Sequence, residues 1–313
     1  MSAKLLAAFL NYNTSSEIEE ALQSLPAAGE GVAFDLLVLD NASTKAGEKE
    51  KLRSLLPEKN LLFFQENLGF AGAFNKVLPP KLQGYDYVLL LNSDLLLPKG
   101  FFKKLLDAAE KLPDLGLAGV ALEREDGSAQ FSFGPEPTLW SELTNRSLAQ
   151  KRYVARHKEK QKPFQVENIL GAVMLVNTAA VEKIGPMDPR FFFFFEETEW
   201  CARMRDFGFG VYHFPFLKAV HLQGRAANKT PLRARIEFHR SRRIFFRLRH
   251  GVSAMYFLTA GLFLRLIINA CSMGLLFLLT LGKERFKEKA KLYFGLLFWY
   301  LKGCPESGGL KKA

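Results

Sequence analysis

Short apolar runs alternate with amphipathic segments through the first 122 residues of the chain. The runs have the length of buried strands, and the segments between them repeat apolar residues at helical spacing. The predicted strands are residues 5–10, 36–39, 61–64, 87–91 and 115–122, and the predicted helices are residues 17–25, 48–56, 70–78 and 101–112. This alternation is typical of a Rossmann-like α/β fold, in which helices flank a mostly parallel sheet.

The pattern changes twice further along the chain. Residues 123–168 are more polar and predict a less regular excursion with one or two helices, after which residues 169–224 return to strand and helix signals. We therefore expect residues 1–230 to form the α/β domain, and residues 231–313 to form a separate helical region.

The helical region combines basic and apolar residues in a way that favours membrane association. Residues 233–250 interleave arginines with Ile and Phe, and residues 252–281 are almost continuously apolar. This run exceeds the roughly 20 apolar residues that span a bilayer, but Arg265 and Asn269 near its middle make a simple span costly. A hairpin with residues 293–301 in the membrane plane and a helix buried in a larger core are the alternatives.

The formal net charge of +11 is unevenly placed along the 313 residues. Residues 225–313 contain 18 Lys and Arg against 4 Asp and Glu, whereas residues 1–224 contain 25 against 28. Such a basic tail binds anionic lipid or nucleic acid. The adjoining apolar run favours lipid, so we expect no nucleic-acid partner.

Two features predict a cytosolic location for the N-terminal domain. The apolar run at residues 5–10 is too short for a signal peptide, so the N-terminus is expected to stay in the cytosol. The three cysteines, Cys201, Cys271 and Cys304, are odd in number and widely spaced, which argues against a disulfide framework or a paired-cysteine metal site.

Polar side chains follow three of the predicted strands. Asn11, Tyr12 and Asn13 follow the first strand, Asp40 and Asn41 the second, and Asn92, Ser93 and Asp94 the fourth. Each set alone is typical of an Asx turn. Because ligands bind beyond the carboxyl ends of parallel strands, the three sets together predict a site for a polar, phosphorylated ligand. A carboxylate such as Asp94 can join Mg²⁺ or Mn²⁺ to a diphosphate.

The segment from Asn67 to Asn75 adds a possible helix start. Its Gly69 and Phe70 open the predicted helix, where backbone N–H groups could face a phosphate. A glycine needed only for close packing explains the segment equally well. No dinucleotide-binding or P-loop glycine pattern occurs in the chain.

Five phenylalanines at residues 191–195 run directly into Glu196, Glu197 and Glu199. An apolar wall raises the pKa of a neighbouring carboxyl group, as a general base at neutral pH requires. On a helix that begins at Glu196, residues 196, 199 and 203 share one face, Glu199 can pair with Arg203, and Glu197 points elsewhere. An acidic first turn favoured by the helix dipole is the simpler alternative. His221 follows a probable strand and is either structural or able to share a cation with Asp94.

Taken together and in this order, these segments resemble the inverting glycosyltransferases of family 2, which have a GT-A fold, and most closely their rhamnosyltransferase-like branch. The resemblance also runs through residues 171–176, 184–188, 221–224 and 240–247. The chain departs from the family pattern in three ways. Glu197 and Glu199 stand where Asp is common, Lys45 replaces another common Asp, and Arg225 and Ala226 replace the usual small polar residue after Gly224.

The resemblance implies a role for each candidate residue. Glu197 would be the general base, with Glu196 beside it, and Asp94 and His221 would hold Mg²⁺ or Mn²⁺. The donor nucleotide would be bound by Asn11, Tyr12, Asn13, Asp40, Asn41, Asn67, Gly69, Phe70, Asn75, Asn92 and Ser93, with Asp40 at the nucleobase. The sugar or acceptor would be contacted by Gly171, Ala172, Trp200 and Arg203.

The resemblance also implies a function in cell-envelope glycan synthesis at the cytoplasmic face of the bacterial inner membrane. The donor is expected to be a nucleotide sugar, with dTDP-rhamnose the first choice and a UDP-hexose or GDP-hexose the alternative. The acceptor is expected to be a saccharide on a polyprenyl diphosphate or a growing glycan. A non-catalytic membrane scaffold for glycans or nucleotides is the alternative from another class, and a nucleic-acid-binding protein that uses residues 233–249 is a third.

Overall fold

The computed structural model describes residues 3–78, 84–222, 231–280 and 283–310. Gln223, Gly224, Arg225, Ala226 and Leu281, which belong to segments singled out above, lie outside the described residues. The chain divides into two compact units. The first holds residues 1–136, 147–189 and 196–226, and the second holds residues 137–146, 190–195 and 227–313. The second unit thus includes two short segments that the sequence pattern assigned to the α/β domain.

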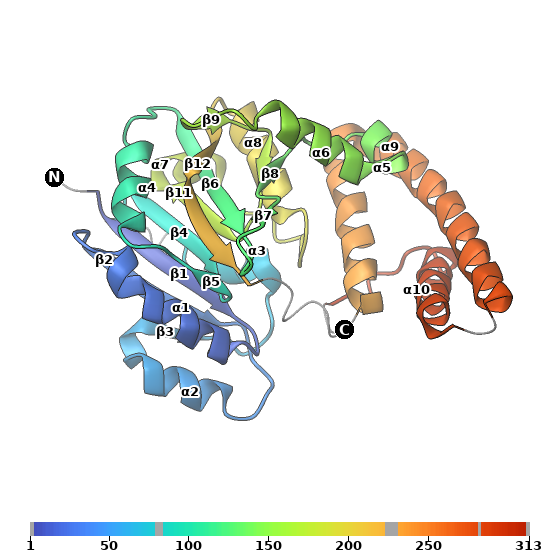
Figure 1. Ribbon diagram of the computed structural model, residues 1–313, viewed down its shortest axis with the longest axis horizontal. Helices are drawn as coiled ribbons and strands as arrows, with labels where there is room; N and C mark the ends of the chain where they lie inside the picture. Colours follow the sequence, from blue (N-terminus) through green and yellow to red (C-terminus); the bar gives the residue numbers. More distant parts are fainter. Residues whose placement is uncertain (1–2, 79–83, 223–230, 281–282, 311–313) are drawn as a thin grey trace. The chain divides into compact units, whose positions relative to one another are not determined.

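The first unit is built on one large mixed sheet with flanking helices (Figure 1). Its strands lie in the order β3-β2-β1-β4-β11-β6-β12-β5. The bounds are β1 Leu5–Asn11, β2 Phe34–Asp40, β3 Leu61–Phe63, β4 Tyr87–Asn92, β5 Leu95–Leu96, β6 Leu115–Glu123, β11 Val173–Asn177 and β12 Gly210–His221. Strands β3, β2, β1 and β4 are parallel, as predicted, whereas β11 runs antiparallel between β4 and β6.

Short strands complete the edges of this sheet. β7 (Ala129–Gln130) pairs with β6 and β9 (Phe164–Gln165) pairs with β12, while β8 (Phe133–Gly134) and β10 (Asn168–Ile169) form a separate pair. The helices are α1 Ser15–Ala28, α2 Glu48–Leu55, α3 Gly69–Phe74, α4 Phe101–Ala109, α6 Arg146–Arg156, α7 Thr178–Ile184 and α8 Glu196–Asp206. The polar excursion therefore contains α6 as well as α5 of the second unit.

The central strands are covered on both faces, which explains their continuous apolar runs. Phe9 of β1 and Leu89 and Leu91 of β4 are completely buried in the main core. Helix α3 is shorter than predicted because the chain after Phe74 turns with three-residue hydrogen bonds, Lys76 to Ala73 and Val77 to Phe74.

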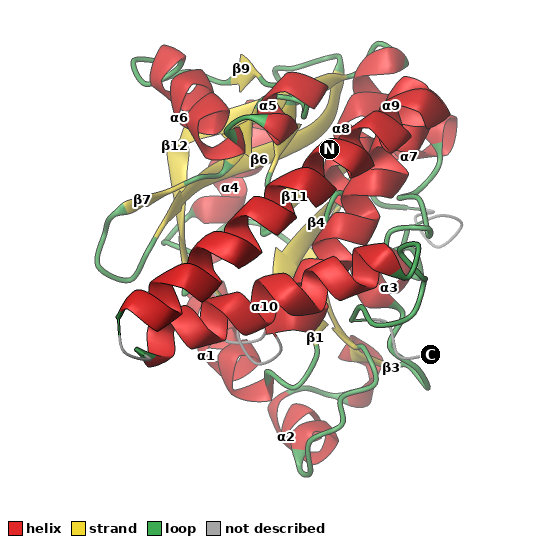
Figure 2. Ribbon diagram, turned by 90° about the vertical axis from the view of Figure 1, so that its right-hand side faces the viewer, coloured by secondary structure: helices red, strands yellow, loops and turns green. Residues whose placement is uncertain are grey.

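The second unit contains α5 (Leu139–Leu143), α9 (Pro231–Leu279) and α10 (Glu284–Leu301). Non-helical angles at Gly251, with φ 87° and ψ 172°, divide α9 into two halves. Helix α10 turns back and packs along α9, as Figure 2 shows, and the two helices form a hairpin whose expected place in a membrane stays a prediction. The core of the second unit includes Phe245, Leu258 and Trp299.

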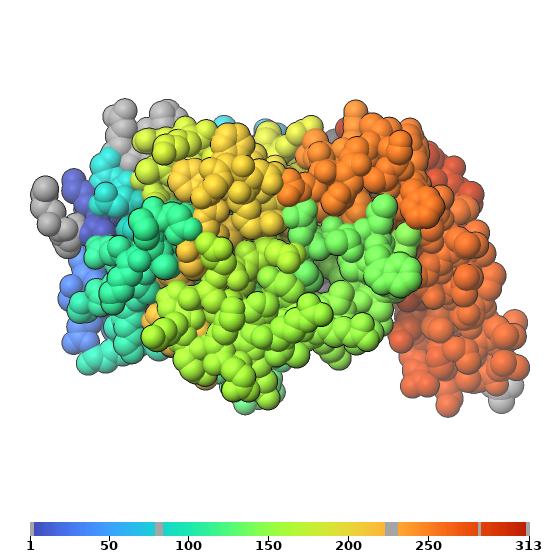
Figure 3. All heavy atoms as spheres, turned by 90° about the horizontal axis from the view of Figure 1, so that it is seen from above, coloured from blue at the N-terminus to red at the C-terminus, as the bar shows by residue number. Residues whose placement is uncertain are grey.

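Helix α9 is long and apolar enough to cross a membrane, by length and composition alone. Only 17% of its most apolar window is buried, so most of that window lies at the surface, where α9 appears in orange in Figure 3. Phe257, Leu264 and Leu278 are each at least 60% exposed. A contiguous apolar surface of this kind suits a lipid or a partner protein.

Candidate functional site

The polar side chains after β1 and β2 meet at one edge of the sheet. The parallel register places Asn11 beside Asp40, and the Asn11 Nδ2 atom donates to Asp40 Oδ1 at 2.7 Å. Ser43 donates to the same Asp40 oxygen at 2.5 Å and accepts from Asn11 Nδ2 at 3.1 Å. Asn11 and Asp40 are 0% and 1% exposed, so they form the buried base of the edge, while Ser43 and Tyr12 are half-buried.

The loops after β1 and β2 are fastened together by Asn13. Its Oδ1 atom accepts from the backbone N–H groups of Thr44 and Lys45, each at 2.8 Å, and its own N–H donates to Ser43 Oγ at 2.8 Å. Asn13 and Ala42 both have left-handed backbone angles, with φ of 60° and 58°. Such strained residues concentrate at binding and catalytic sites. The side chain of Lys45, at the position that departs from the family pattern, donates to the Asn13 carbonyl at 2.8 Å.

Two backbone amides at the start of α3 are bound by side chains, and the phosphate-facing role expected of this helix start stays a prediction. Asn41 Oδ1 accepts from the Leu68 N–H at 2.8 Å, and Asn67 Oδ1 accepts from the Gly69 N–H at 2.9 Å. Asn41 Nδ2 returns to Asn67 Oδ1 at 2.9 Å. Gly69 is needed because its φ is 73°, a left-handed angle that disfavours any side chain.

Phe70 and Asn75 act inside the first unit. The Phe70 ring is buried and packs so closely on Gly171 that a Cβ there would lie 3.2 Å from it. Asn75 exchanges two hydrogen bonds with the Met187 backbone, at 2.7 and 3.1 Å. We therefore assign Asn75 to holding the loop after α7, in place of the nucleotide contact expected for it. Ala172, also buried, accepts from the Asn92 N–H at 3.0 Å.

The turn after β4 brings Asp94 to His221, as the sequence suggested. The two residues come together because β5, directly after Asp94, pairs with the end of β12. His221 Nε2 lies 3.2 Å from Asp94 Oδ1, and His221 Nδ1 lies 3.2 Å from Gln130 Oε1. Ser93 is buried and Asn92 half-buried beside them. Acceptors thus flank both ring nitrogens, an arrangement that suits a metal ion at Nε2 beside the Asp94 carboxylate.

The Asp94–His221 pair fits one part of a divalent-cation site. Adjacent ligands of an octahedral ion at about 2.1 Å stand about 3.0 Å apart, close to the observed 3.2 Å. Within the described ranges no group of three or more His, Cys, Asp or Glu side chains could hold a metal ion.

The acidic segment forms the first turn of α8, and its expected pairing is present. Arg203 makes two hydrogen bonds of 3.0 Å with Glu199, one turn away. The same guanidinium donates to the carbonyls of Ile184 at 2.7 Å and Pro186 at 2.8 Å. Trp200 is 0% exposed and donates to the Gly185 carbonyl at 3.1 Å. Both residues therefore anchor the loop after α7, and the acceptor contacts expected of Trp200 and Arg203 stay a prediction.

Glu196 and Glu197 stand directly after an unusual stretch of backbone. Phe194 and Phe195 both have left-handed angles, with φ of 69° and 68°, which disfavour side chains by about 1–2 kcal/mol per residue. Glu196 is 4% exposed and Glu197 is half-buried. Burial raises the pKa of the Cys201 thiol to about 12, and Glu197 acts in the same direction. Cys201 is thus a buried thiol and not a nucleophile.

Sequence reasoning missed the parts of the site that arrive from distant segments. Gln130 lies in the polar excursion and has no sequence signal of its own, although it orients the His221 ring. The strained angles at Ala42, Phe194 and Phe195 also had no signal, because Ala and Phe give no hint of a left-handed backbone.

Comparison with known proteins assigns this chain to a family. Residues 9–168 match the profile of glycosyl transferase family 2. The chain is also similar in sequence to the three proteins that follow. The chain is 26% identical over 258 residues, 77% of its length and 83% of the relative's, to the N-acetylglucosaminyl-diphospho-decaprenol L-rhamnosyltransferase of Mycobacterium tuberculosis. It is 25% identical to the dTDP-rhamnosyl transferase RfbF of Shigella flexneri, over 69% of each chain. It is 26% identical to the hexosyltransferase Agl10 of Haloferax volcanii, over 66% of this chain and 64% of the relative.

Solved structures show the same fold. The mannosyltransferase PcManGT from Pyrobaculum calidifontis, in complex with GDP-Man and Mn²⁺, superposes with a TM-score of 0.56 at 14% identity and covers 98% of this chain and 88% of its own. GalNAc-T7 with UDP, GalNAc and Mn²⁺ gives 0.53 at 16% identity, over 70% of this chain and 43% of its own. These likenesses establish a GT-A-type architecture.

Proposed function

Since this chain belongs to glycosyl transferase family 2, we propose that it transfers a sugar, with inversion, from a nucleotide-sugar donor to a lipid-linked saccharide or growing glycan. The observation that carries the proposal is the Asp94–His221 pair at the same strand ends as the Asn11–Asp40–Ser43 cluster. Our first choice of donor is dTDP-rhamnose, because two relatives are rhamnosyltransferases. The hexosyltransferase relative supports a UDP-hexose or GDP-hexose as the second choice.

The donor half of the proposal assigns binding to the ends of β1, β2 and β4. Tyr12, Asn13 and Ser43 are the accessible members of the edge, and buried Asn11 holds the Asp40 carboxylate toward it. Asp94 and His221 would hold Mg²⁺ or Mn²⁺ together with the donor diphosphate. Bound there, the cation would neutralise charge on the departing nucleoside diphosphate.

The acceptor half assigns proton removal to Glu197. Its place in the first turn of α8, beside the apolar Phe run, suits a carboxylate that takes the proton of an attacking hydroxyl. Glu196, buried at the same helix end, would help to position it. An oxygen placed in line with the bond to the leaving diphosphate would then invert the anomeric carbon.

The second unit supports a location at the cytosolic face of a bacterial inner membrane. Its exposed apolar residues on α9 and α10 and its excess of Lys and Arg would bind an anionic bilayer. A lipid-linked acceptor would present its saccharide at that surface.

The donor half is tested first by thermal unfolding with dTDP, UDP, GDP, CDP and NAD, each with and without Mn²⁺ or Mg²⁺. A ligand that binds only the folded chain raises its melting temperature by mass action, so no acceptor is required. We expect one nucleoside diphosphate to raise it in a metal-dependent way, and dTDP to give the largest rise. A folded sample that responds to none of them would reject the transferase and favour a scaffold.

A further inference from the structure

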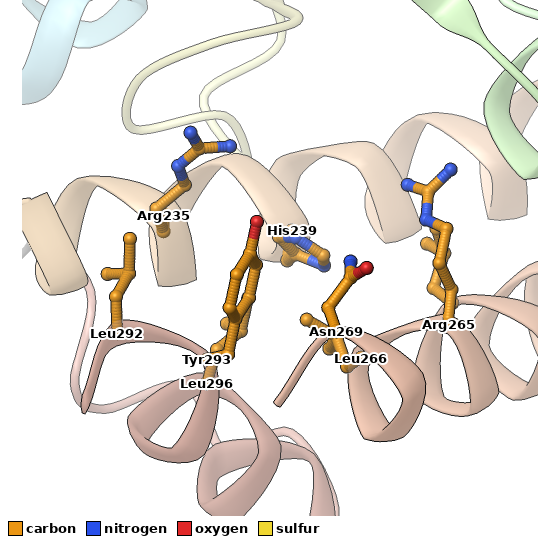
Figure 4. A pocket seen from close by; sticks show the side chains of 9 residues that line it. Arg235, His239, Arg265, Leu266, Asn269, Leu292, Tyr293 and Leu296 are labelled. Carbon is orange, nitrogen blue, oxygen red and sulfur yellow. The ribbon is translucent and has the colours of Figure 1, made fainter. Parts of the chain in front are cut away.

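A pocket of about 160 Å³ lies within the second unit, between both halves of α9 and α10. Arg235 and His239 come from the first half, Arg265 and Asn269 from the second half, and Tyr293 from α10. Figure 4 shows Arg235 and Arg265 at the two ends of the pocket, with His239, Tyr293 and Asn269 between them. Four leucines complete the lining. The pocket is thus cationic at both ends and apolar along its walls.

The positive charge of this pocket is only partly balanced, because none of its lining residues is acidic, although Glu142 acts on Arg265 from outside the lining. Glu142 pairs with Arg242 at 2.9 Å and with Arg146 at 3.5 Å. Glu237 pairs with Arg240 at 3.0 Å. Both acids that face this helical bundle therefore already have arginine partners.

The two pocket arginines, Arg235 and Arg265, form weaker contacts than these ion pairs. Arg265 donates one N–H to the Glu142 carbonyl at 3.0 Å, a contact with a neutral group. Arg235 forms neither a hydrogen bond nor an ion pair with any residue in the described ranges. Arg235 is exposed and Arg265 is half-buried, so the cost of removing charge from water falls on Arg265, and an anion between the two arginines would offset that cost.

The chemistry of the lining selects the kind of anion. Arginine binds phosphate through paired N–H groups, and Asn and Tyr add polar contacts to phosphate oxygens. The volume corresponds to roughly five water molecules, at about 30 Å³ each, which suits a phosphate group. The leucine walls and the exposed apolar surface of the same helices suit a hydrocarbon chain.

We propose that this pocket binds the phosphate group of a lipid, whose hydrocarbon chain lies along the apolar surface of α9 and α10. A polyprenyl diphosphate and an anionic phospholipid share this chemistry. In the first case the pocket would hold the carrier end of the acceptor, a role that rests on the proposed function. In the second it would fasten the chain to the bilayer.

The test measures binding of three probes to the full chain in neutral detergent micelles by microscale thermophoresis. The probes are a polyprenyl diphosphate, phosphatidylglycerol and inorganic pyrophosphate. We expect at least one lipid probe to bind, and Arg235→Gln and Arg265→Gln each to weaken it about tenfold. Arg247→Gln is the matched control, since it removes the same charge from an exposed position on α9.

The lipid that binds more tightly identifies which of the two lipid classes the pocket takes. A preference for either lipid supports the proposal. Equal weakening by Arg247→Gln, or no weakening by the two pocket variants, would overturn the proposal. So would inorganic pyrophosphate that binds as tightly as the lipids. Because Arg265 also supports the Glu142 backbone, circular dichroism checks its variant, and Arg235→Gln keeps the test decisive if that variant unfolds. Nucleotide thermal shifts on the same variants report the donor site separately.

Discussion

At the scale of single residues, the candidate site consists of polar groups that are positioned by one another. Asp40 is held by Asn11 and Ser43, and His221 by Gln130, so two of the proposed contacts are pre-organised by buried neighbours. Pre-organisation of this kind lets a site bind without reordering its side chains. Glu197 and Asp94 are the residues on which the proposed chemistry depends most directly.

Replacing Glu197 by Gln removes the proposed base and keeps the size of the side chain. We expect the transfer rate to fall by at least about 100-fold, the lower range for loss of a general base. The metal-dependent thermal shift with nucleotide should remain, because donor binding does not use this carboxylate. Glu199→Gln is the control, since Glu199 serves Arg203 and should affect stability more than the chemical rate. Normal turnover in Glu197→Gln would remove the base assignment.

Replacing Asp94 by Asn tests the proposed cation site. The amide retains the shape of the side chain but loses the charge that a hard cation prefers. We expect the difference in melting temperature between nucleotide with and without Mn²⁺ to disappear. Asp107→Asn, which alters an exposed carboxylate paired with Lys103, should leave that difference intact. A full Mn²⁺ response in Asp94→Asn would show that any cation binds elsewhere.

At the scale of elements, two side chains of α8 hold the helix against the loop after α7. Arg203 joins Glu199 to the carbonyls of Ile184 and Pro186, and Trp200 adds a bond to Gly185. This arrangement fixes the position of the first turn of α8, and with it the carboxylates of Glu196 and Glu197. The sequence predicted the Glu199–Arg203 pair from helical spacing, but the loop carbonyls become visible only in the folded chain.

Loss of the Arg203 side chain should therefore destabilise the first unit. Arg203→Met retains the aliphatic stem and removes every polar contact, and it leaves Glu199 without its partner. We expect the free energy of unfolding to fall by about 3 kcal/mol, measured by urea titration. Arg53→Met, at an exposed ion pair with Glu58, should cost less than about 1 kcal/mol. Equal costs for the two variants would contradict the anchoring role.

At the scale of the whole molecule, stability should depend on pH through a buried histidine. Burial lowers the pKa of His213 from 6.5 to about 4, in a setting of Phe133 and Phe164 rings. The unfolded chain binds a proton at this residue below pH 6.5, and the folded chain resists it until about pH 4. Stability contributed by the neutral ring is therefore fully present above pH 6.5 and is lost as the pH falls toward 4.

The size of this effect is about 3 kcal/mol for a shift of this magnitude. Urea unfolding between pH 7.5 and 4.5 should show a steeper loss of stability for the native chain than for His213→Gln. Glutamine can still bond Ser132, which contacts His213 at 3.0 Å, but it does not titrate. Identical pH slopes in the two proteins would exclude His213 as the source.

The local pattern of the chain determined the strands, most helices and the polar residues at strand ends, because each of these depends on neighbours a few positions away. The segments that resemble glycosyltransferase family 2 also predicted that the chain belongs to this family, which the comparisons established. The helical hairpin of the C-terminal region followed from its two apolar runs and the basic residues between them.

Tertiary structure alone decided which of those residues meet. The antiparallel insertion of β11, the burial of Trp200, the bond from the Leu68 amide to Asn41 and the approach of Gln130 to His221 all join segments distant in sequence. A side chain's neighbours across such distances are set by how whole elements pack, and packing responds to shape and burial that no local pattern records. For that reason the sequence could propose candidate site residues, while only the fold shows which of them lie close together and which are buried.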